Sequence, residues 1–224
     1  GMGLDLYNGY PLAKEVFDWK IGIISALSLA IMPAHINRSA FGYTDHHVAE
    51  GLFLTTLILL LIYSLKEAKK SELNSSDLRI RSKIRNPAIF SILAGIAVAF
   101  MILTFTGAPI YVGMIWIYMV SQYLLDRWMN RSTDYLTIVS AIMFGTALAV
   151  TLPVILASEF GKKFLFSGWL LSWLHILLLI ASLILLLFFG IISNIIHKRR
   201  LKWYIYFALM LIIIFGSIFA IQTI

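Results

Sequence analysis

Uncharged stretches, most of them about the length of a bilayer crossing, alternate with short polar segments along the chain. A helix needs about 20 apolar residues to cross the hydrocarbon core of a membrane, and these stretches supply them. The longest, residues 86–125, would form a helix of about 60 Å, so it is expected to turn at the glycine and proline of residues 106–109. The pattern thus predicts seven spans, the first complete or partial: residues 16–33, 47–65, the two halves of 86–125, 135–158, 166–196 and 203–224.

The composition of the chain supports a membrane protein and excludes a water-soluble domain. Of its 224 residues, 60% are hydrophobic and 13% are charged, whereas about a quarter are charged in soluble domains. The mean hydropathy is +0.89, which a water-exposed surface of this size does not accommodate. The predicted fold class is all-α, a polytopic integral membrane protein. The sequence contains no cysteine, which excludes disulfides, thiolate metal sites and a cysteine nucleophile.

The distribution of Lys and Arg predicts the orientation of the spans. Seven of the 18 basic residues lie in the segment 66–85, and alternation of the spans places fifteen on one side of the membrane and three on the other. Basic residues concentrate on the cytoplasmic side, so the side with three is expected to face outward, with residues 36–47 on it. This bias explains the net charge of +7 without a nucleic-acid partner. We therefore expect a protein of the cell membrane, in contact with its lipids.

One outward segment, residues 35–50, concentrates ionisable groups at the edge of the membrane, where burying them is costly. Asp45 and His47 are two residues apart, so on an extended segment both side chains point to the same side. A carboxylate oxygen and an imidazole nitrogen suit Mn²⁺, Mg²⁺ or Zn²⁺, and further ligands must come from elsewhere in the chain or from a partner. Glu50, one turn into the next helix, is a candidate ligand or supports the ligands. Arg38 offers a planar donor suited to a phosphate or pyrophosphate oxygen.

A second interpretation of the same residues needs no metal. Asp45 is a favoured residue type for the N-terminal cap of a helix that starts at His46. The Arg38 side chain can bury its apolar methylene groups while its guanidinium reaches the water. A non-enzymatic small membrane protein, either a transporter or a divalent-cation-binding protein, would also use ionisable groups at the membrane. His175 is expected to be a packed histidine within a span.

The same segment carries a longer pattern: Met32-Pro33-Ala34-His35, Arg38-Ser39, Gly42, Asp45-His46-His47 and Glu50. In this pattern the chain resembles the catalytic subunit of oligosaccharyltransferase, especially the archaeal enzymes of N-glycosylation. In that family an Arg-Ser or Arg-Thr pair and a glycine precede an Asp-x-Asp or Asp-x-His motif. The resemblance extends, less specifically, over residues 12–157, including the stretches 17–22, 93–96 and 104–109.

The resemblance implies a metal-dependent glycosyltransferase. Its lipid-linked donor would be an oligosaccharide on dolichol phosphate or diphosphate, and its acceptor an asparagine in Asn-x-Ser/Thr of a polypeptide. Carried over by position, Asp45 and His47 would bind the divalent cation, and Asp45 and Arg38 would be the catalytic residues. Arg38 would lie beside the metal and the phosphate end of the donor, and Glu50 matches an acidic position that we assign to substrate binding. His46, between the two ligands, is expected to be a bystander.

Three parts of the family pattern have no match in the sequence. Family members carry an upstream external loop with another metal-binding aspartate, a later external loop with a catalytic glutamate, and a soluble C-terminal domain with a Trp-Trp-Asp-Tyr-Gly motif. We therefore expect a central fragment of a longer enzyme, inactive as an isolated chain. Residues 1–15 would be a truncated lead-in segment, and residues 16–224 a transmembrane helical domain.

Overall fold

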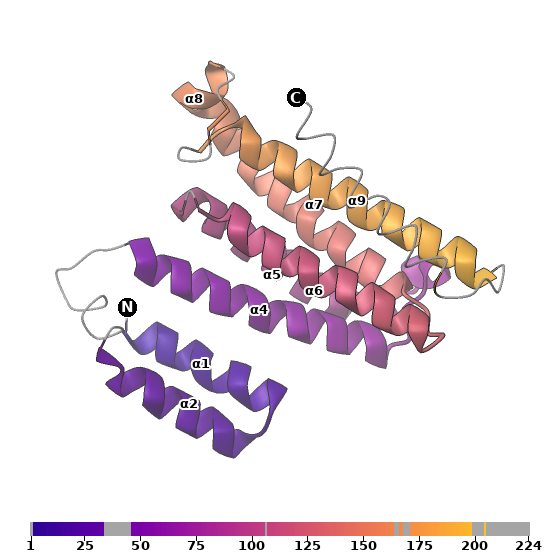
Figure 1. Ribbon diagram of the computed structural model, residues 1–224, viewed down its shortest axis with the longest axis horizontal. Coiled ribbons are helices and arrows are strands. Elements are labelled where there is room, and N and C mark those ends of the chain that lie inside the picture. The colour runs from indigo at the N-terminus through magenta and orange to yellow at the C-terminus, as the bar shows by residue number, and fades with distance from the viewer. Residues whose placement is uncertain are drawn as a thin grey trace.

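The computed structural model describes residues 2–33, 46–105, 107–163, 166–167, 171–198 and 204 of the chain. Every regular element in these ranges is a helix (Figure 1), which confirms the predicted all-α class. In chain order the helices are α1 (Met2–Val16), α2 (Trp19–Ile31), α4 (His46–Lys70), the short 3₁₀ helix η1 (Ser75–Arg79), α5 (Arg81–Thr104), α6 (Pro109–Trp128), α7 (Asp134–Ala157), α8 (Glu159–Lys162) and α9 (Trp173–Lys198).

Four of the described helices are long and apolar enough to cross a membrane, and all four coincide with predicted spans. They are Val48–Lys70 within α4, Arg81–Thr104, Asp134–Ala157 and Trp173–Ile196 within α9. The predicted turn is also present, because α5 ends at Thr104 and α6 begins at Pro109. Neither α6 nor the 13-residue α2 is one of the four, although each falls in a predicted span. The last predicted span lies outside the described residues except for Tyr204, so the number seven stays a prediction.

The first two helices form a hairpin that packs against α4 (Figure 1). The Asp18 carboxylate caps α2 by accepting a hydrogen bond of 2.8 Å from the amide of Ile21. Near the end of α4, the Lys66 ammonium forms an ion pair of 2.8 Å with Glu15 and also donates to the Glu15 carbonyl. Residues 2–15, within the predicted lead-in segment, are therefore helical and are joined to the first membrane-spanning helix.

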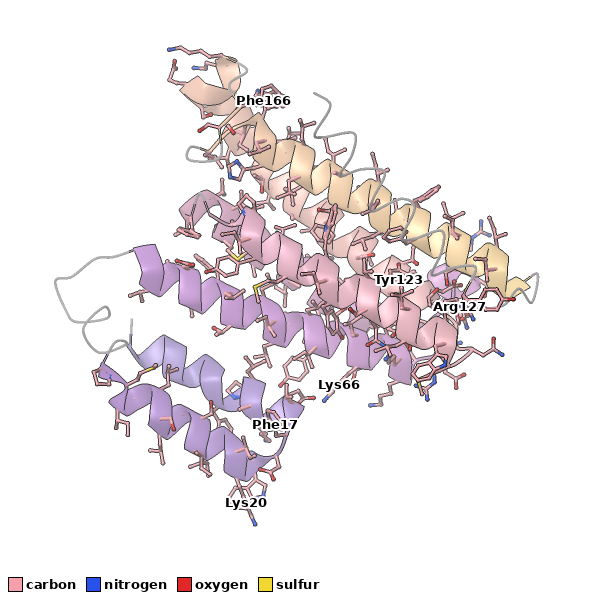
Figure 2. The ribbon with its side chains drawn as sticks, in the orientation of Figure 1. Phe17, Lys20, Lys66, Tyr123, Arg127 and Phe166 are labelled. Atoms are coloured by element: carbon pink, nitrogen blue, oxygen red, sulfur yellow. The ribbon has the colours of Figure 1, made fainter. Side chains whose placement is uncertain are left out.

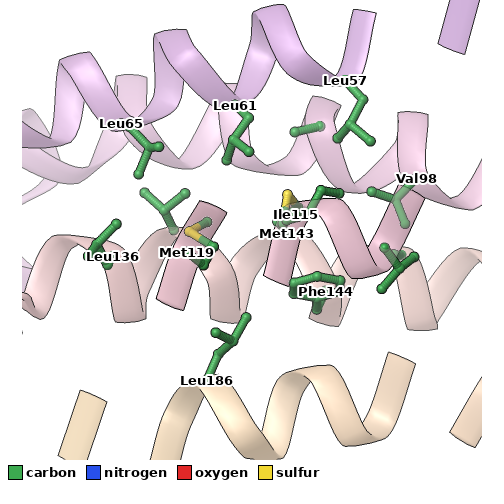
Figure 3. Packing of buried hydrophobic residues seen from close by; sticks show 14 of the residues in the cluster. Leu57, Leu61, Leu65, Val98, Ile115, Met119, Leu136, Met143, Phe144 and Leu186 are labelled. Carbon is green, nitrogen blue, oxygen red and sulfur yellow. The ribbon is translucent and has the colours of Figure 1, made fainter. Parts of the chain in front are cut away.

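A continuous apolar core joins α4, α5, α6, α7 and α9. Figure 3 shows Leu57 and Leu61 of α4 pointing toward α7, which carries Met143 and Phe144, and Leu186 of α9 pointing into the core from the opposite side. Lipid tails are as apolar as leucine, so close packing of the side chains, more than exclusion of water, holds membrane helices together. The fit of this core therefore determines how the helix ends are placed relative to one another.

Two glycines allow α7 to approach its neighbours closely. A Cβ added at Gly95 of α5 would lie 2.3 Å from the backbone oxygen of Met143. A Cβ added at Gly190 of α9 would lie 2.1 Å from the hydroxyl oxygen of Thr137. Because real Cβ atoms do not come this close to other atoms, both crossings require a residue without a side chain, as is common between membrane helices.

Serine hydroxyl groups of α4 and α5 are hydrogen-bonded to each other. The hydroxyl oxygens of Ser64 and Ser91 lie 2.6 Å apart, and each also lies within hydrogen-bond distance of the Pro87 carbonyl, Ser64 at 3.0 Å and Ser91 at 2.8 Å. One hydroxyl therefore donates to the other, which donates to the carbonyl. No water is available in the bilayer core to bond such groups, so they must find partners within the protein.

Gly95→Ala is expected to lower the free energy of unfolding by about 1–3 kcal/mol, because the new methyl group overpacks the crossing of α5 and α7. Gly113→Ala in α6 is the matched control. No atom lies within 4 Å of a Cβ added there, and alanine favours a helix by about 1 kcal/mol over glycine. Thermal unfolding of both variants in detergent measures the difference. Equal Tm values would contradict the close approach at Gly95.

Candidate functional site

The predicted acidic–histidine segment meets the start of α4. The described part of that helix begins at His46, so the capping interpretation of Asp45 stays a prediction. Arg38 and Asp45 lie outside the described residues, as do the side chains of His46 and His47. Glu50 is the candidate residue whose side chain the structure describes, and it lies one turn into α4.

Glu50 is buried, with 8% of its surface exposed, and its carboxylate accepts a hydrogen bond from the hydroxyl of Tyr111. Tyr111 lies in the first turn of α6, which Pro109 opens. The Phe105 ring, just beyond α5, lies 6.2 Å from the Tyr111 ring, measured between centres. A buried carboxylate is costly unless it is hydrogen-bonded. The Tyr111 hydroxyl therefore stabilises Glu50 and joins the starts of α4 and α6.

Glu50 and Tyr111 lie at one end of the helix bundle, which we call the acidic–histidine end because α4 begins there. Neighbouring spans run in alternate directions, so this end also collects the C-terminal ends of α5 and α7 and the start of α9 (Figure 1). Here the buried His175 accepts a hydrogen bond of 3.3 Å at Nδ1 from the amide of Ser172. The prediction of a packed histidine is thus confirmed.

The opposite end of the bundle, the basic end, carries the segment 66–85 together with Arg127. Figure 2 shows Arg127 at this end and Phe166 at the other. Lys83 donates a hydrogen bond of 3.0 Å to Asp77, which holds the pKa of the Asp77 carboxyl below its usual range. The buried Arg127 donates to the carbonyl of Ser193 at 3.2 Å. The alternation of spans therefore places the start of α4, which the acidic–histidine segment precedes in sequence, at the opposite end of the bundle from the main cluster of basic residues.

Within the described part of the chain, no group of three or more His, Asp or Glu side chains could hold a metal ion. The predicted ligands Asp45 and His47 belong to the residues whose side chains lie outside that part, so their geometry stays a prediction. The chemistry of this pair, one carboxylate oxygen and one imidazole nitrogen, fits a divalent cation such as Mn²⁺ or Mg²⁺. Tyr111 was missed by the sequence reasoning. The sequence signal for Tyr111 was its position. It is a tyrosine in the first turn of an apolar helix, at the end of that helix predicted to face outward.

The fold and the distribution of charge define a class of protein: an all-helical membrane protein with ionisable groups gathered at the ends of its spans. Residues 8–224 match the family model described as oligosaccharyl transferase STT3, N-terminal. The chain belongs to this family.

Two curated relatives are archaeal glycotransferases. Dolichyl-phosphooligosaccharide-protein glycotransferase 3 of Archaeoglobus fulgidus is 26% identical over 145 residues, which are 64% of this chain and 16% of that protein. Dolichyl-monophosphooligosaccharide–protein glycotransferase AglB of Haloferax volcanii is 26% identical over 152 residues, which are 65% of this chain and 14% of that protein. The chain therefore spans a small part of the length of both relatives.

Two solved structures share the arrangement of helices. One is a crystal structure of the Archaeoglobus fulgidus oligosaccharyltransferase tethered with an acceptor peptide containing the NVT sequon. It has a TM-score of 0.80 and 22% identity, over 97% of this chain and 26% of the other. The second is archaeal oligosaccharyltransferase AglB from Archaeoglobus fulgidus in complex with an inhibitory peptide and a dolichol-phosphate. It has a TM-score of 0.80 and 23% identity, over 98% of this chain and 25% of the other. At 22% and 23% identity, these two matches show a shared fold but not a shared function.

Tyr111→Phe removes the hydroxyl that reaches Glu50. It is expected to lower the free energy of unfolding in detergent by about 1.5–3 kcal/mol, the usual contribution of a hydrogen bond to a charged group. In a double-mutant cycle, Tyr111→Phe and Glu50→Ala should be non-additive by more than about 0.5 kcal/mol.

Tyr123→Phe is the matched control for this cycle. It removes a hydroxyl that lies 2.9 Å from the Thr137 hydroxyl near the other end of α6. Its effect should add to that of Glu50→Ala, since the two sites share no partner. Additive effects of Tyr111→Phe and Glu50→Ala would show that the hydrogen bond between α4 and α6 does not form.

Proposed function

We propose that this chain forms part of the membrane domain of an oligosaccharyltransferase. In this proposal the enzyme moves an oligosaccharide from dolichol phosphate or diphosphate to the asparagine of an Asn-x-Ser/Thr sequon. The observation that carries the proposal is the family match over residues 8–224, which includes the whole pattern from Met32 to Glu50. The names of the relatives support it, since both are glycotransferases of dolichyl-linked oligosaccharides. The related structures contain an acceptor peptide and a dolichol-phosphate.

Asp45 and His47 would hold a divalent cation at the start of α4. When bound, the cation would supply positive charge that stabilises the phosphate leaving group of the lipid donor. Arg38 would bind a phosphate oxygen of the donor through the paired N–H groups of its guanidinium. Glu50, hydrogen-bonded to Tyr111, would support the first turn of α4 and line the substrate-binding edge.

The acidic–histidine end of the bundle suits a donor that is anchored in the membrane. The phosphate of a lipid-linked oligosaccharide lies at the interface between lipid and water, and α4 begins its membrane span at Val48, just beyond His47. An acceptor polypeptide reaches the same interface from the aqueous side. We place this end on the outer side of the cell membrane, because most of the Lys and Arg residues belong to the other end.

The alternative function, a transporter or a divalent-cation-binding membrane protein, is not favoured by the described helices. Their buried acidic, basic and histidine residues are Glu50, Asp126, Arg127 and His175, each near an end of its helix. Ion pathways usually place such residues within the spans. Between the ends, the buried polar groups are hydroxyls, such as those of Ser64 and Ser140.

Asp45→Ala is expected to lower oligosaccharide transfer to a sequon peptide by at least about a hundredfold, because the loss of a metal ligand removes several kcal/mol of charge stabilisation. Transfer is measured with the full-length enzyme of which this chain would form a part, in its membranes, with a fluorescent peptide bearing Asn-x-Thr. His46→Ala, the neighbouring substitution in the same helix turn, should retain most of the activity. Wild-type transfer by Asp45→Ala would contradict the assignment of the site. Equal loss of activity in both variants would mean that the substitutions disrupt the start of α4 and do not identify a metal ligand.

A further inference from the structure

A hollow at the basic end of the bundle has no role in the proposed function. It has a volume of about 510 Å³ and lies between the C-terminal end of α4 and the connection from α6 to α7. Lys69 and Glu72 line it from α4 and the residues that follow, Asp126 and Arg131 from the end of α6, and Tyr135 from the start of α7. Because α4 and α7 are long and apolar enough to cross a membrane, we expect the hollow to lie where their ends meet the lipid headgroups.

Two similar helix ends shape this hollow. Beyond α4, Glu72 has a left-handed φ of 48°, and the next amide, that of Leu73, bonds back to the helix at 3.0 Å. Beyond α6, Asn130 has a left-handed φ of 54°, and the amide of Arg131 bonds back to the Asp126 carbonyl at 2.7 Å. Both ends have the Schellman arrangement, in which the chain reverses and satisfies the last carbonyls of the helix. The reversals bring Glu72 and Arg131 to the same hollow.

Two cations in the hollow have no carboxylate partner within the described ranges. The Lys69 ammonium lies 5.1 Å from the centre of the Tyr135 ring, which attracts it through the π-electrons. The exposed guanidinium of Arg131 forms no ion pair with any described residue. By contrast, nearby Lys66 and Lys83 each have a carboxylate within 3.0 Å. Lys69 and Arg131 are therefore free to bind an anionic group.

Two carboxylates in the hollow offset the charge of these two cations. Asp126 lies at the back of the hollow with 1% of its surface exposed, and its two oxygens accept hydrogen bonds from Gln122, at 3.1 Å, and from the Tyr135 hydroxyl. Glu72 is exposed at the rim. Since the four side chains carry no net charge, the hollow is complementary to a ligand that carries both signs.

We propose that this hollow binds the phosphoethanolamine headgroup of a membrane phospholipid. The lipid phosphate would lie against Lys69 and Arg131, and the ammonium would donate hydrogen bonds toward Glu72, with Asp126 stabilising it from the back. A choline headgroup has the same charges but no N–H donor, and a glycerol headgroup has the phosphate but no cation. The binding of this lipid is independent of whether the protein transfers a glycan.

The test is a titration of the purified 224-residue chain in detergent with three dioleoyl lipids, phosphatidylethanolamine, phosphatidylcholine and phosphatidylglycerol, with bound lipid counted by native mass spectrometry. Phosphatidylethanolamine should bind most tightly. Lys69→Gln/Arg131→Gln should weaken its binding at least about tenfold, since both charged donors to the lipid phosphate are lost. Glu72→Gln should remove the preference over phosphatidylglycerol.

Lys70→Gln/Arg79→Gln is the matched control, because it removes the same charge from the same end of the bundle without touching the hollow. This variant should bind as the wild type does. Equal weakening by both double variants would mean diffuse attraction to the basic end and would overturn the proposal. Equal affinity for the three lipids would do the same, as would soluble phosphoethanolamine binding as tightly as the lipid.

The Tm of each variant without added lipid shows whether it folds. If Lys69→Gln/Arg131→Gln does not fold, Arg131→Lys replaces it, because lysine keeps the charge and loses the paired donors of the guanidinium. Arg131→Lys should weaken the binding of phosphatidylethanolamine severalfold, and unchanged binding by this variant would also overturn the proposal.

Discussion

The interior of a membrane has no water to stabilise a charge, and this constraint determines where the ionisable side chains of the described helices lie. Buried acidic, basic and histidine residues occur near the helix ends, and the buried carboxylates there have hydrogen-bond donors from neighbouring helices. Glu50 accepts from Tyr111, and Asp126 accepts from Tyr135. Between the ends, the described interior contains apolar side chains and hydroxyl groups but no buried acidic, basic or histidine residue.

The two ends differ in the ligands that they suit. At the acidic–histidine end, a segment rich in ligand-type side chains leads into α4, which the Glu50–Tyr111 hydrogen bond ties to α6. At the basic end, reversed helix termini place cations and carboxylates around one hollow. The close crossings at Gly95 and Gly190 join the spans between them. This apolar core separates the two proposed interfacial sites and contributes no reactive group of its own.

Sequence reasoning predicted the spans because the length of an apolar run is a direct consequence of bilayer thickness. It predicted the turn before Pro109 because glycine and proline favour turns. It ended the second span at Leu65, before the first lysine, whereas α4 continues to Lys70, because a helix can carry lysines where it leaves the hydrocarbon. It assigned no helix to residues 2–15, which carry Asp5 and Pro11; their helix is packed on α2 and α4.

The contacts of the candidate residues could not be predicted in the same way. Glu50 was selected because an acid at a membrane edge is costly, but its partner Tyr111 is distant in sequence and becomes its neighbour only through the packing of α4, α5 and α6. The hollow at the basic end depends on two left-handed residues, Glu72 and Asn130, neither of which is glycine. Asparagine is one of the residues that favour this position after a helix, so Asn130 carried a weak sequence signal, whereas Glu72 carried none.

The central claim is that the segment before α4 and the basic segment lie on opposite faces of the membrane, and the cysteine-free sequence permits a direct test. Single variants Ser39→Cys, Lys163→Cys and Ser76→Cys are treated in intact cells with a membrane-impermeant maleimide. The account predicts labelling of Ser39→Cys and Lys163→Cys in intact cells, and labelling of Ser76→Cys only after the membrane has been permeabilised. Labelling of Ser39→Cys and Ser76→Cys from the same side would contradict it.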